Sequence, residues 1–103
     1  MAPNMNQMMK QARKMQADLA KAQEESVLLE AEATVGGGAV TAVAKGDTTI
    51  KSIKIDPDAV DVDDIEMLED LVLAAVNEAL RDVQDQVSDK MSEITGGLNI
   101  PGL

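Results

Sequence analysis

The stretch that decides the fold runs from Met5 to Leu29 and reads MNQMMKQARKMQADLAKAQEESVLL. Small and apolar residues recur in it at alternating steps of three and four. We call these residues the seam: Met5, Met8, Ala12, Met15, Leu19, Ala22, Ser26 and Leu29. A repeat of about 3.5 residues is the heptad of a coiled coil, whose a and d positions are buried against a partner. The pattern therefore predicts a long helix, over residues 4–29, with one apolar side.

The cations of this stretch lie on the opposite side of the predicted helix. We call them the basic stripe, and all four fall at heptad positions b, c or f: Lys10, Arg13, Lys14 and Lys21. Asn4, followed three residues later by Gln7, fits an N-cap with a capping box. The helix thus offers an apolar surface to one partner and a cationic surface to another.

Three short runs in which apolar and polar residues alternate follow this helix. A period of two predicts half-buried strands, here at residues 30–35, 39–45 and 48–55. The runs are joined by Gly36-Gly37-Gly38 and by Gly46-Asp47. Connections this short link antiparallel neighbours, so the three strands are expected to form a meander.

A second amphipathic helix is predicted over residues 63–95, where apolar residues recur at a mean step near 3.6. Gly96-Gly97 ends it, and residues 96–103 are expected to form a loose tail. The predicted fold class is α+β, an α-β-β-β-α protomer with a three-stranded antiparallel sheet and two long helices. Residues 1–103 are expected to form a single domain.

The predicted helices are longer than the predicted sheet. Helices of about 25 and 32 residues span about 38 and 48 Å, whereas strands of six or seven residues cover about 20 Å. Both helices should overhang the sheet and expose apolar sides in a monomer. The chain also lacks Phe, Trp and Tyr, the side chains that usually dominate core energetics. We therefore expect a homodimer with protruding helical arms.

Composition argues against most kinds of catalysis. Cys and His are both absent, which removes disulfides, thiolate nucleophiles, Cys/His zinc sites and His-based acid–base chemistry. Ser88 and Lys90 are two residues apart, and such residues do not face each other on a helix. No apolar run approaches the roughly 20 residues of a membrane span. The sequence predicts a soluble intracellular protein with no enzymatic activity, no catalytic residues, no cofactor and no membrane contact.

Two further patterns resemble ligand sites but do not fit them. Counting an EF-hand loop from Asp56 puts Asp61 where the loop needs Gly and Met67 where it needs Glu. The acidic run before the second helix is better explained by the helix macrodipole, which favours acids at an N-terminus. The three consecutive glycines open a strand, whereas a phosphate-binding loop opens a helix. We expect neither a metal site nor a nucleotide site.

Charge is distributed unevenly along the chain, whose net charge is −10. Residues 1–22 carry +3, residues 23–55 carry −2 and residues 56–103 carry −11. In the second helix, Arg81 and Lys90 are each flanked by acids, which predicts ion pairs within that helix. By charge alone, the basic stripe fits a solvated face and a polyanion-binding site equally well. Without aromatic residues to stack on bases, nucleic-acid binding would be limited to salt-dependent contacts with phosphates.

Several segments together carry a family resemblance. They are Met9-Lys10-Gln11-Ala12 with Met15-Gln16, the glycine turn before Val40, Ile53-Lys54-Ile55-Asp56-Pro57, and Glu66-Met67-Leu68-Glu69-Asp70-Leu71-Val72 with Ala75, Asn77, Glu78 and Ala79. The chain resembles the YbaB/EbfC family of small bacterial nucleoid-associated proteins over nearly all of its length. The resemblance implies an α-β-β-β-α homodimer, located at the nucleoid in the cytoplasm, whose protruding helices grip duplex DNA. Lys10 matches a basic position of the family's first helix, whereas Arg13 and Lys14 occupy a stretch that is often Gln-rich in relatives.

Two hypotheses follow for function. The first is a dimeric nucleoid-associated protein that binds double-stranded DNA through phosphate contacts of Lys10, Arg13, Lys14 and Lys21. Such binding would be largely sequence-tolerant, with an effect on nucleoid organisation or gene expression. The alternative is a non-catalytic interaction module that captures an unidentified protein with its Met-rich seam, so that effects on DNA are indirect.

Overall fold

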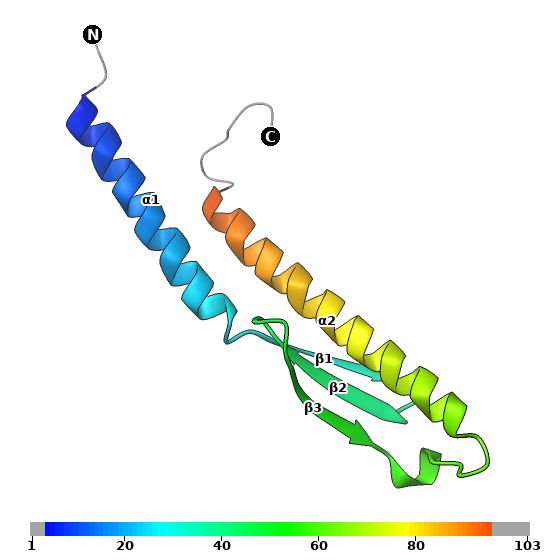
Figure 1. The fold of residues 1–103 in the computed structure, drawn as a ribbon. Coiled ribbons are helices and arrows are strands. Elements are labelled where there is room, and N and C mark those ends of the chain that lie inside the picture. The colour runs from blue at the N-terminus through cyan, green and yellow to red at the C-terminus, as the bar shows by residue number, and fades with distance from the viewer. Residues whose placement is uncertain (1–3, 96–103) are drawn as a thin grey trace.

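The computed structural model describes residues 4–95, in which two long helices flank a small antiparallel sheet (Figure 1). The elements, in chain order, are α1 (Met5–Ser26), β1 (Glu30–Val35), β2 (Val40–Lys45), β3 (Ile50–Ile55), the short 3-10 helix η1 (Pro57–Ala59) and α2 (Ile65–Thr95). The predicted α-β-β-β-α order is confirmed. The predicted tail, residues 96–103, lies outside the described residues.

Helix α1 ends at Ser26, earlier than the predicted end at Leu29. The Ser26 hydroxyl donates to the Gln23 carbonyl (2.9 Å), and the Leu29 N–H donates to the Ser26 carbonyl (3.1 Å), so the chain turns here. Gly46 packs against this turn, and its N–H donates to the Leu29 carbonyl (2.8 Å). A Cβ atom on Gly46 would lie only 1.7 Å from the Ser26 carbonyl oxygen. Only glycine therefore allows the turn between β2 and β3 to approach the end of α1.

Strand β3 begins at Ile50, two residues later than predicted, because the preceding residues belong to a tight turn. Thr48 has a positive φ of 66°, which is unusual for a β-branched residue. The Asp47 side chain accepts the Thr49 N–H (3.0 Å) and also the Thr49 hydroxyl. These bonds lower the pKa of Asp47 below its ordinary value. The turn is thus held by side-chain bonds that compete with strand pairing.

The acids between β3 and α2 cap local backbone turns. Three of them accept backbone N–H groups two or three residues ahead: Asp56 from Asp58, Asp61 from Asp63, and Asp64 from Met67. The first of these caps η1, which the sequence did not predict, and the third shifts the start of α2 to Ile65. Within residues 4–95, no group of three or more acidic side chains is placed to hold a metal ion.

The core lies between α2 and one face of the sheet, whose strand order is β1-β2-β3. The core combines alanines of the first two strands, together with Val40, with buried residues of α2: Ala31, Ala33, Ala42 and Ala44 from the sheet, and Ala75, Ala79 and Val83 from the helix. Small side chains on both surfaces let the helix approach the sheet closely. Helix α2 covers β1 and β2 and makes few contacts with β3. On the inner face of β3, Ile53 and Ile55 therefore remain exposed.

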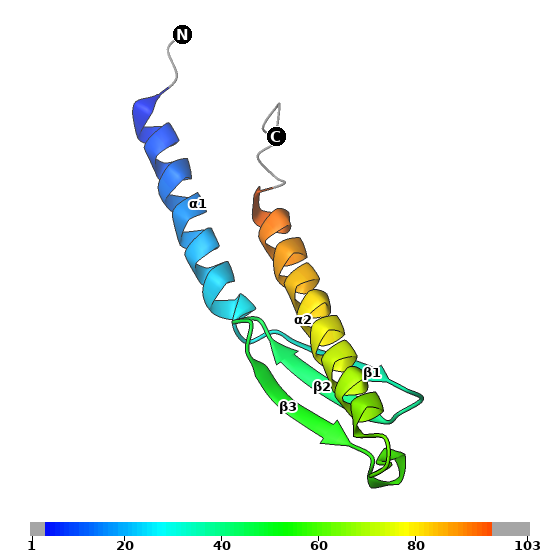
Figure 2. The same cartoon turned by 45° about the vertical axis from the view of Figure 1, so that its right-hand side comes forward.

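Both helices continue past the sheet in the same direction (Figures 1 and 2). The second half of α2 runs beside the second half of α1, and the first half of α1 reaches further. The Cα radius of gyration is 20.5 Å, whereas a compact domain of 100 residues would have about 13 Å. The predicted overhang of the helices is confirmed.

Candidate nucleic-acid interface

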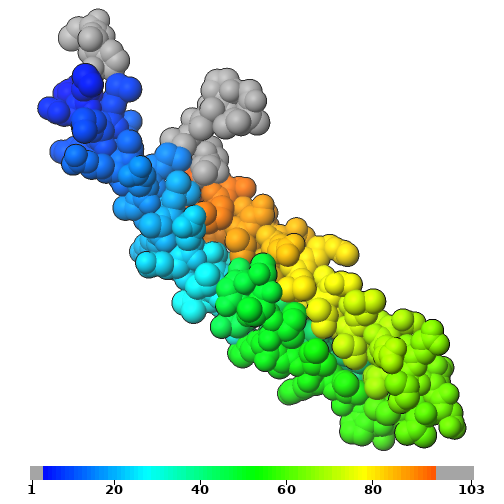
Figure 3. All heavy atoms as spheres, viewed as in Figure 1, coloured from blue at the N-terminus to red at the C-terminus, as the bar shows by residue number. Residues whose placement is uncertain are grey.

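The two halves of α1 have different surroundings. We call residues 5–14 the distal half and residues 15–26 the proximal half. In the proximal half, the seam residues Ala22 and Ser26 are buried. In the distal half, Met5 is 74% exposed and Met8 is 55% exposed. Figure 3 shows this end of α1, in dark blue, standing clear of the rest of the described chain.

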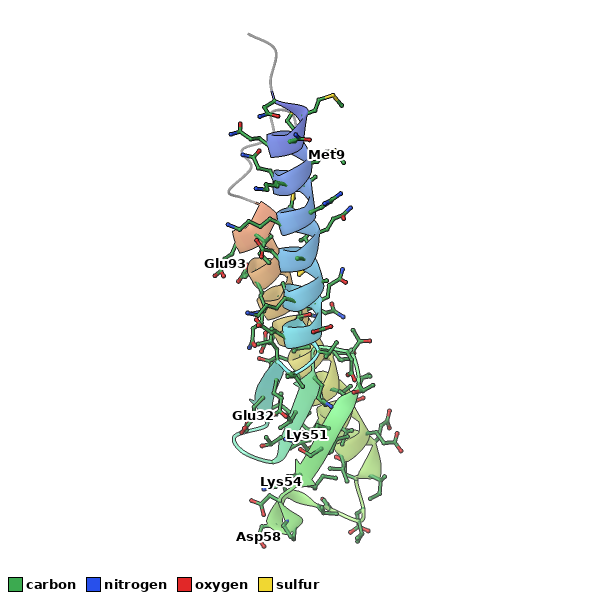
Figure 4. All side chains as sticks on the ribbon, turned by 90° about the vertical axis from the view of Figure 1, so that its left-hand side faces the viewer. Met9, Glu32, Lys51, Lys54, Asp58 and Glu93 are labelled. Carbon is green, nitrogen blue, oxygen red and sulfur yellow. The ribbon has the colours of Figure 1, made fainter. Side chains whose placement is uncertain are left out.

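Three of the four basic-stripe residues lie together on the distal half. Lys10, Arg13 and Lys14 are exposed, and within residues 4–95 none of them has an acidic partner within 4.0 Å. Lys10 and Arg13 also line a shallow hollow of about 360 Å³ with Asn6 and Met9. Figure 4 shows side chains radiating from this part of the helix, with Met9 labelled. The distal half is thus an exposed helical segment in which all three cations can contact a polyanion.

Lys21, the fourth residue of the basic stripe, lies in a different environment. It is about 16 Å from Lys10 along the helix axis, since each helical residue rises about 1.5 Å. Its Nζ is 3.9 Å from Oε1 of Glu25, one turn further along α1. The structure therefore brings three of the predicted site residues together and places the fourth beside α2.

Among residues 4–95, Lys90 has no acidic partner within 4.0 Å in its own helix, so the prediction of an ion pair within α2 is wrong for this residue. Its Nζ lies 3.0 Å from Oε2 of Glu25 on α1. Helical periodicity along α2 could not reveal this contact, because it depends on how the two helices pack. Glu25 and Lys90 both line a hollow of about 460 Å³ between the helices, whose other acidic lining residues are Asp18 and Glu93.

Glu25 has a pKa below its ordinary value. The largest cause is the hydrogen bond from Lys90, followed by the charge of Lys90, and Lys21 adds a smaller effect. Burial acts in the opposite direction and has a larger effect than Lys21. The carboxylate of Glu25 is therefore held in its charged form between two cations.

Cations on the outer face of the sheet were not singled out from the sequence. Lys54 is paired with Thr41 in the register between β2 and β3, which places it on the face away from α2. Lys51 lies 2.7 Å from Glu30 across the sheet. Figure 4 shows Lys51 and Lys54 on the sheet, toward the opposite end of the molecule from Met9. The alternation of the strands could have identified this face, but its lysines are interspersed with acids.

Arg81 is exposed on α2 and has no acidic partner within 4.0 Å among residues 4–95, so its predicted intrahelical pair is absent as well. Its acidic neighbours in α2 still surround it in sequence. Most acids of the described chain lie on α2 and in the segment before it. The distal half of α1 is therefore the part of the described chain where cations are grouped without acids.

Comparison with known proteins agrees with this arrangement. The sequence profile of the YbaB/EbfC DNA-binding family matches residues 1–98. The chain belongs to the YbaB/EbfC family. It is 57% identical, over 100 residues, to a nucleoid-associated protein of Thermoanaerobacter pseudethanolicus, with 97% of this chain and 90% of that protein covered. It is 53% identical to a nucleoid-associated protein of Pelotomaculum thermopropionicum, with 100% of this chain and 98% of that protein covered.

The fold of the chain also matches a solved structure. The crystal structure of an uncharacterized protein from Helicobacter pylori superposes with a TM-score of 0.72 at 16% identity, covering 91% of this chain and 99% of that chain. At this identity the match concerns the fold alone. The family is described by DNA binding and not by a catalysed reaction. No helix within residues 4–95 is both long and apolar enough to span a membrane.

Proposed function

We propose that this chain is a nucleoid-associated protein that acts in the cytoplasm as a homodimer and binds double-stranded DNA. Contacts between its basic stripe and backbone phosphates supply the affinity. The observation that carries the proposal is the position of Lys10, Arg13 and Lys14: exposed and unpaired among the described residues, on the free half of a protruding helix. Membership of a family described as DNA-binding supports the choice of polyanion.

The geometry of the arm favours phosphates over bases as its targets. One DNA strand carries a phosphate about every 3.4 Å along the axis, so the roughly 16 Å between Lys10 and Lys21 spans about five phosphates. Lysine and arginine contacts to phosphates position a protein but carry no sequence information by themselves. Within the chain there is no aromatic residue to stack on a base. Binding should therefore be sequence-tolerant and strongly dependent on salt.

A second copy of the chain is the proposed occupant of the open flank beside α2. On the inner face of β3, Ile53 and Ile55 are 43% and 39% exposed. On α2, Leu73 is 60% exposed and lines an apolar groove of about 420 Å³ with Leu68, Glu69, Val72 and Val76. Exposed apolar side chains on both a strand and a helix mark an interaction surface.

The surface area of the chain supports a second copy. Its accessible area is 7605 Å², against about 5,600 Å² for a compact monomer of this mass. A standard interface buries about 800 Å² from each partner, which the excess can supply. Sedimentation should show a dimer at micromolar concentration, and Leu73→Asp should shift it toward monomer. A wild-type monomer at that concentration would rule out the dimer.

Dimerisation would double the cationic surface. Two arms would carry eight stripe cations in a dimer whose net charge is −20, twice the −10 of one chain. The acids on α2 would repel DNA from that side and leave the arms as the favourable approach. We therefore expect weak duplex binding at physiological salt and much tighter binding at low salt.

The test is a salt series of duplex titrations with the triple variant Lys10→Gln/Arg13→Gln/Lys14→Gln. Each lost phosphate contact should flatten the plot of log affinity against log salt by about 0.9. A matched control removes three cations elsewhere, at Lys51, Lys54 and Arg81. We expect this triple variant, the arm variant, to lose most of its affinity for duplex DNA and the control to lose little. Equal losses would mean that only net charge matters and would remove the stripe from the mechanism.

The exposed methionines of the distal half favour the second candidate function. Met side chains adapt to varied partners, and Met5 and Met8 present an apolar edge to solvent. In this alternative the distal seam captures a partner protein, and DNA effects are indirect. Two observations together would support it: a stoichiometric partner retained after nuclease treatment, and no duplex binding by the pure protein at low salt.

A further inference from the structure

Glu25 joins two lysines that come from different helices. One of its carboxylate oxygens lies 3.9 Å from Lys21 on α1, and the other lies 3.0 Å from Lys90 on α2. The Lys90 side chain is 29% exposed, so it is the more enclosed of the two lysines, since Lys21 is 77% exposed. A carboxylate and a phosphodiester each spread one negative charge over two oxygens, and both accept charge-assisted hydrogen bonds from lysine.

We propose that Lys21 and Lys90 form a binding site for a DNA backbone phosphate, and that Glu25 occupies this site as an internal competitor. The inference rests on the proposed function, since it extends the basic stripe. Lys21 is the last member of the stripe, about 10 Å along the axis from Lys14. A duplex that lies along α1 would reach Lys21 and Lys90 next. Glu25 therefore limits how many phosphates one arm can contact.

The other acids around the hollow play a different part. Asp18 and Glu93 line it, but neither lies within 4.0 Å of a lysine among residues 4–95. They repel DNA through their charge but pair with neither lysine. The Glu25 carboxylate, whose pKa lies below the ordinary value of 4.5, is charged at neutral pH, so the site stays closed there. Opening it requires a competing phosphate or loss of the carboxylate.

The experiment compares three substitutions that each remove one negative charge. Glu25→Gln frees both lysines, Glu93→Gln removes an unpaired acid from the same hollow, and Glu24→Gln removes an exposed acid next in sequence. Each full-length variant is titrated with a duplex DNA over a series of salt concentrations. We expect Glu25→Gln to bind about three to ten times more tightly than either control. Its salt dependence should be steeper by about 0.9 for each phosphate gained.

A second substitution, at Lys90, distinguishes the gain of a phosphate-binding site from a change in the packing of the two helices. Lys90→Gln alone should have little effect on DNA affinity, because Glu25 already occupies this lysine. Combined with Glu25→Gln, it should cancel most of the gain, which a double-mutant cycle measures as coupling between the two positions. Thermal unfolding of every variant reports whether α1 stays attached to α2.

Several outcomes would overturn the inference. If Glu25→Gln binds DNA no better than the two controls, Glu25 does not withhold the lysines. If it binds less tightly and melts at a lower temperature, Glu25 is a structural tie between the helices. In both cases the wild type and the arm variant, measured in the same titrations, still test the proposed function. If no protein in the series binds duplex DNA even at the lowest salt, the proposed function fails as well.

Discussion

The distal and proximal halves of α1 share one heptad but differ in what covers them. In the proximal half, the seam packs against α2. It ends at the turn after α1, against which Gly46 packs. In the distal half, the same spacing of residues faces solvent. A heptad shows that one side of a helix is apolar, and it does not show which partner covers that side. The uncovered half is also the half with three unpaired cations, so its exposure and its charge point to one role outside the protomer.

The largest expected effect comes from disrupting the close contact between Gly46 and the turn that ends α1. In Gly46→Ala the new Cβ would collide with the Ser26 carbonyl oxygen, which belongs to the backbone and cannot move aside. We expect the free energy of unfolding to fall by at least about 3 kcal/mol, or folding to fail. Denaturant unfolding followed by circular dichroism measures this loss.

A matched substitution in the other turn controls for the loss of a glycine. A Cβ on Gly37 would meet nothing within 4 Å, although its φ is +68°. Gly37→Ala should therefore cost only the strain of a left-handed residue, about 1–2 kcal/mol. Equal losses of unfolding free energy at the two glycines would contradict the importance of the close contact between Gly46 and the end of α1.

A smaller effect on the free energy of unfolding compares the two halves directly. The same substitution, alanine to aspartate, is made at one seam residue in each half. Ala22 is buried beside a hollow that already contains Asp18, Glu25 and Glu93. Ala22→Asp would add a fourth carboxylate there and should cost about 2 kcal/mol of unfolding free energy. Ala12 is exposed on the distal half, so Ala12→Asp should cost about 0.5 kcal/mol. A similar cost at both positions would mean that the distal seam is covered in solution.

The smallest expected effect is a pH dependence at Glu25, near the end of the proximal half. The pKa of Glu25 is lowered by Lys90, so the charged pair contributes stability above the ordinary pKa of a glutamate. That contribution is lost as pH falls through the lowered pKa of the folded state. The difference between the melting temperatures of the wild type and Glu25→Gln should therefore shrink as pH falls below the ordinary glutamate pKa of 4.5. Asp47 also has a lowered pKa but is present in both proteins, so its effect cancels. A difference that acidification leaves unchanged would mean that the charge of Glu25 is not its source.

Most of the fold could be predicted from periodicity. The strand at residues 30–35 matches β1 in both bounds, and the glycine turn and both helices occur where the sequence places them. The errors fall where side chains bond to the backbone: Ser26 ends α1 early, and Asp47 with Thr49 delays β3. The 3-10 helix η1 arises from the cap that Asp56 provides before Pro57. Such local bonds compete with regular structure and leave no periodic trace in the sequence.

The candidate site was predicted less completely than the fold. Heptad positions correctly put Lys10, Arg13, Lys14 and Lys21 on the exposed side of α1. They could not show that Lys21 shares Glu25 with Lys90, since Glu25 and Lys90 lie 65 residues apart in the chain. Long-range contacts of this kind depend on helix packing, which a pattern within one helix does not encode. The assignment of the stripe to DNA stays a prediction.

Site-specific crosslinking tests most directly whether the distal half contacts DNA. The chain has no cysteine, so a single introduced cysteine can carry a photoreactive crosslinker without interference. Gln7→Cys places the reagent about one helical turn from Lys10 and two turns from Lys14, and Asp70→Cys places it on the exposed side of α2. We predict efficient crosslinking of duplex DNA from residue 7, which added salt abolishes, and little from residue 70. Equal crosslinking at the two positions, or more at residue 70, would contradict the proposal that the distal half of α1 is the DNA-binding surface.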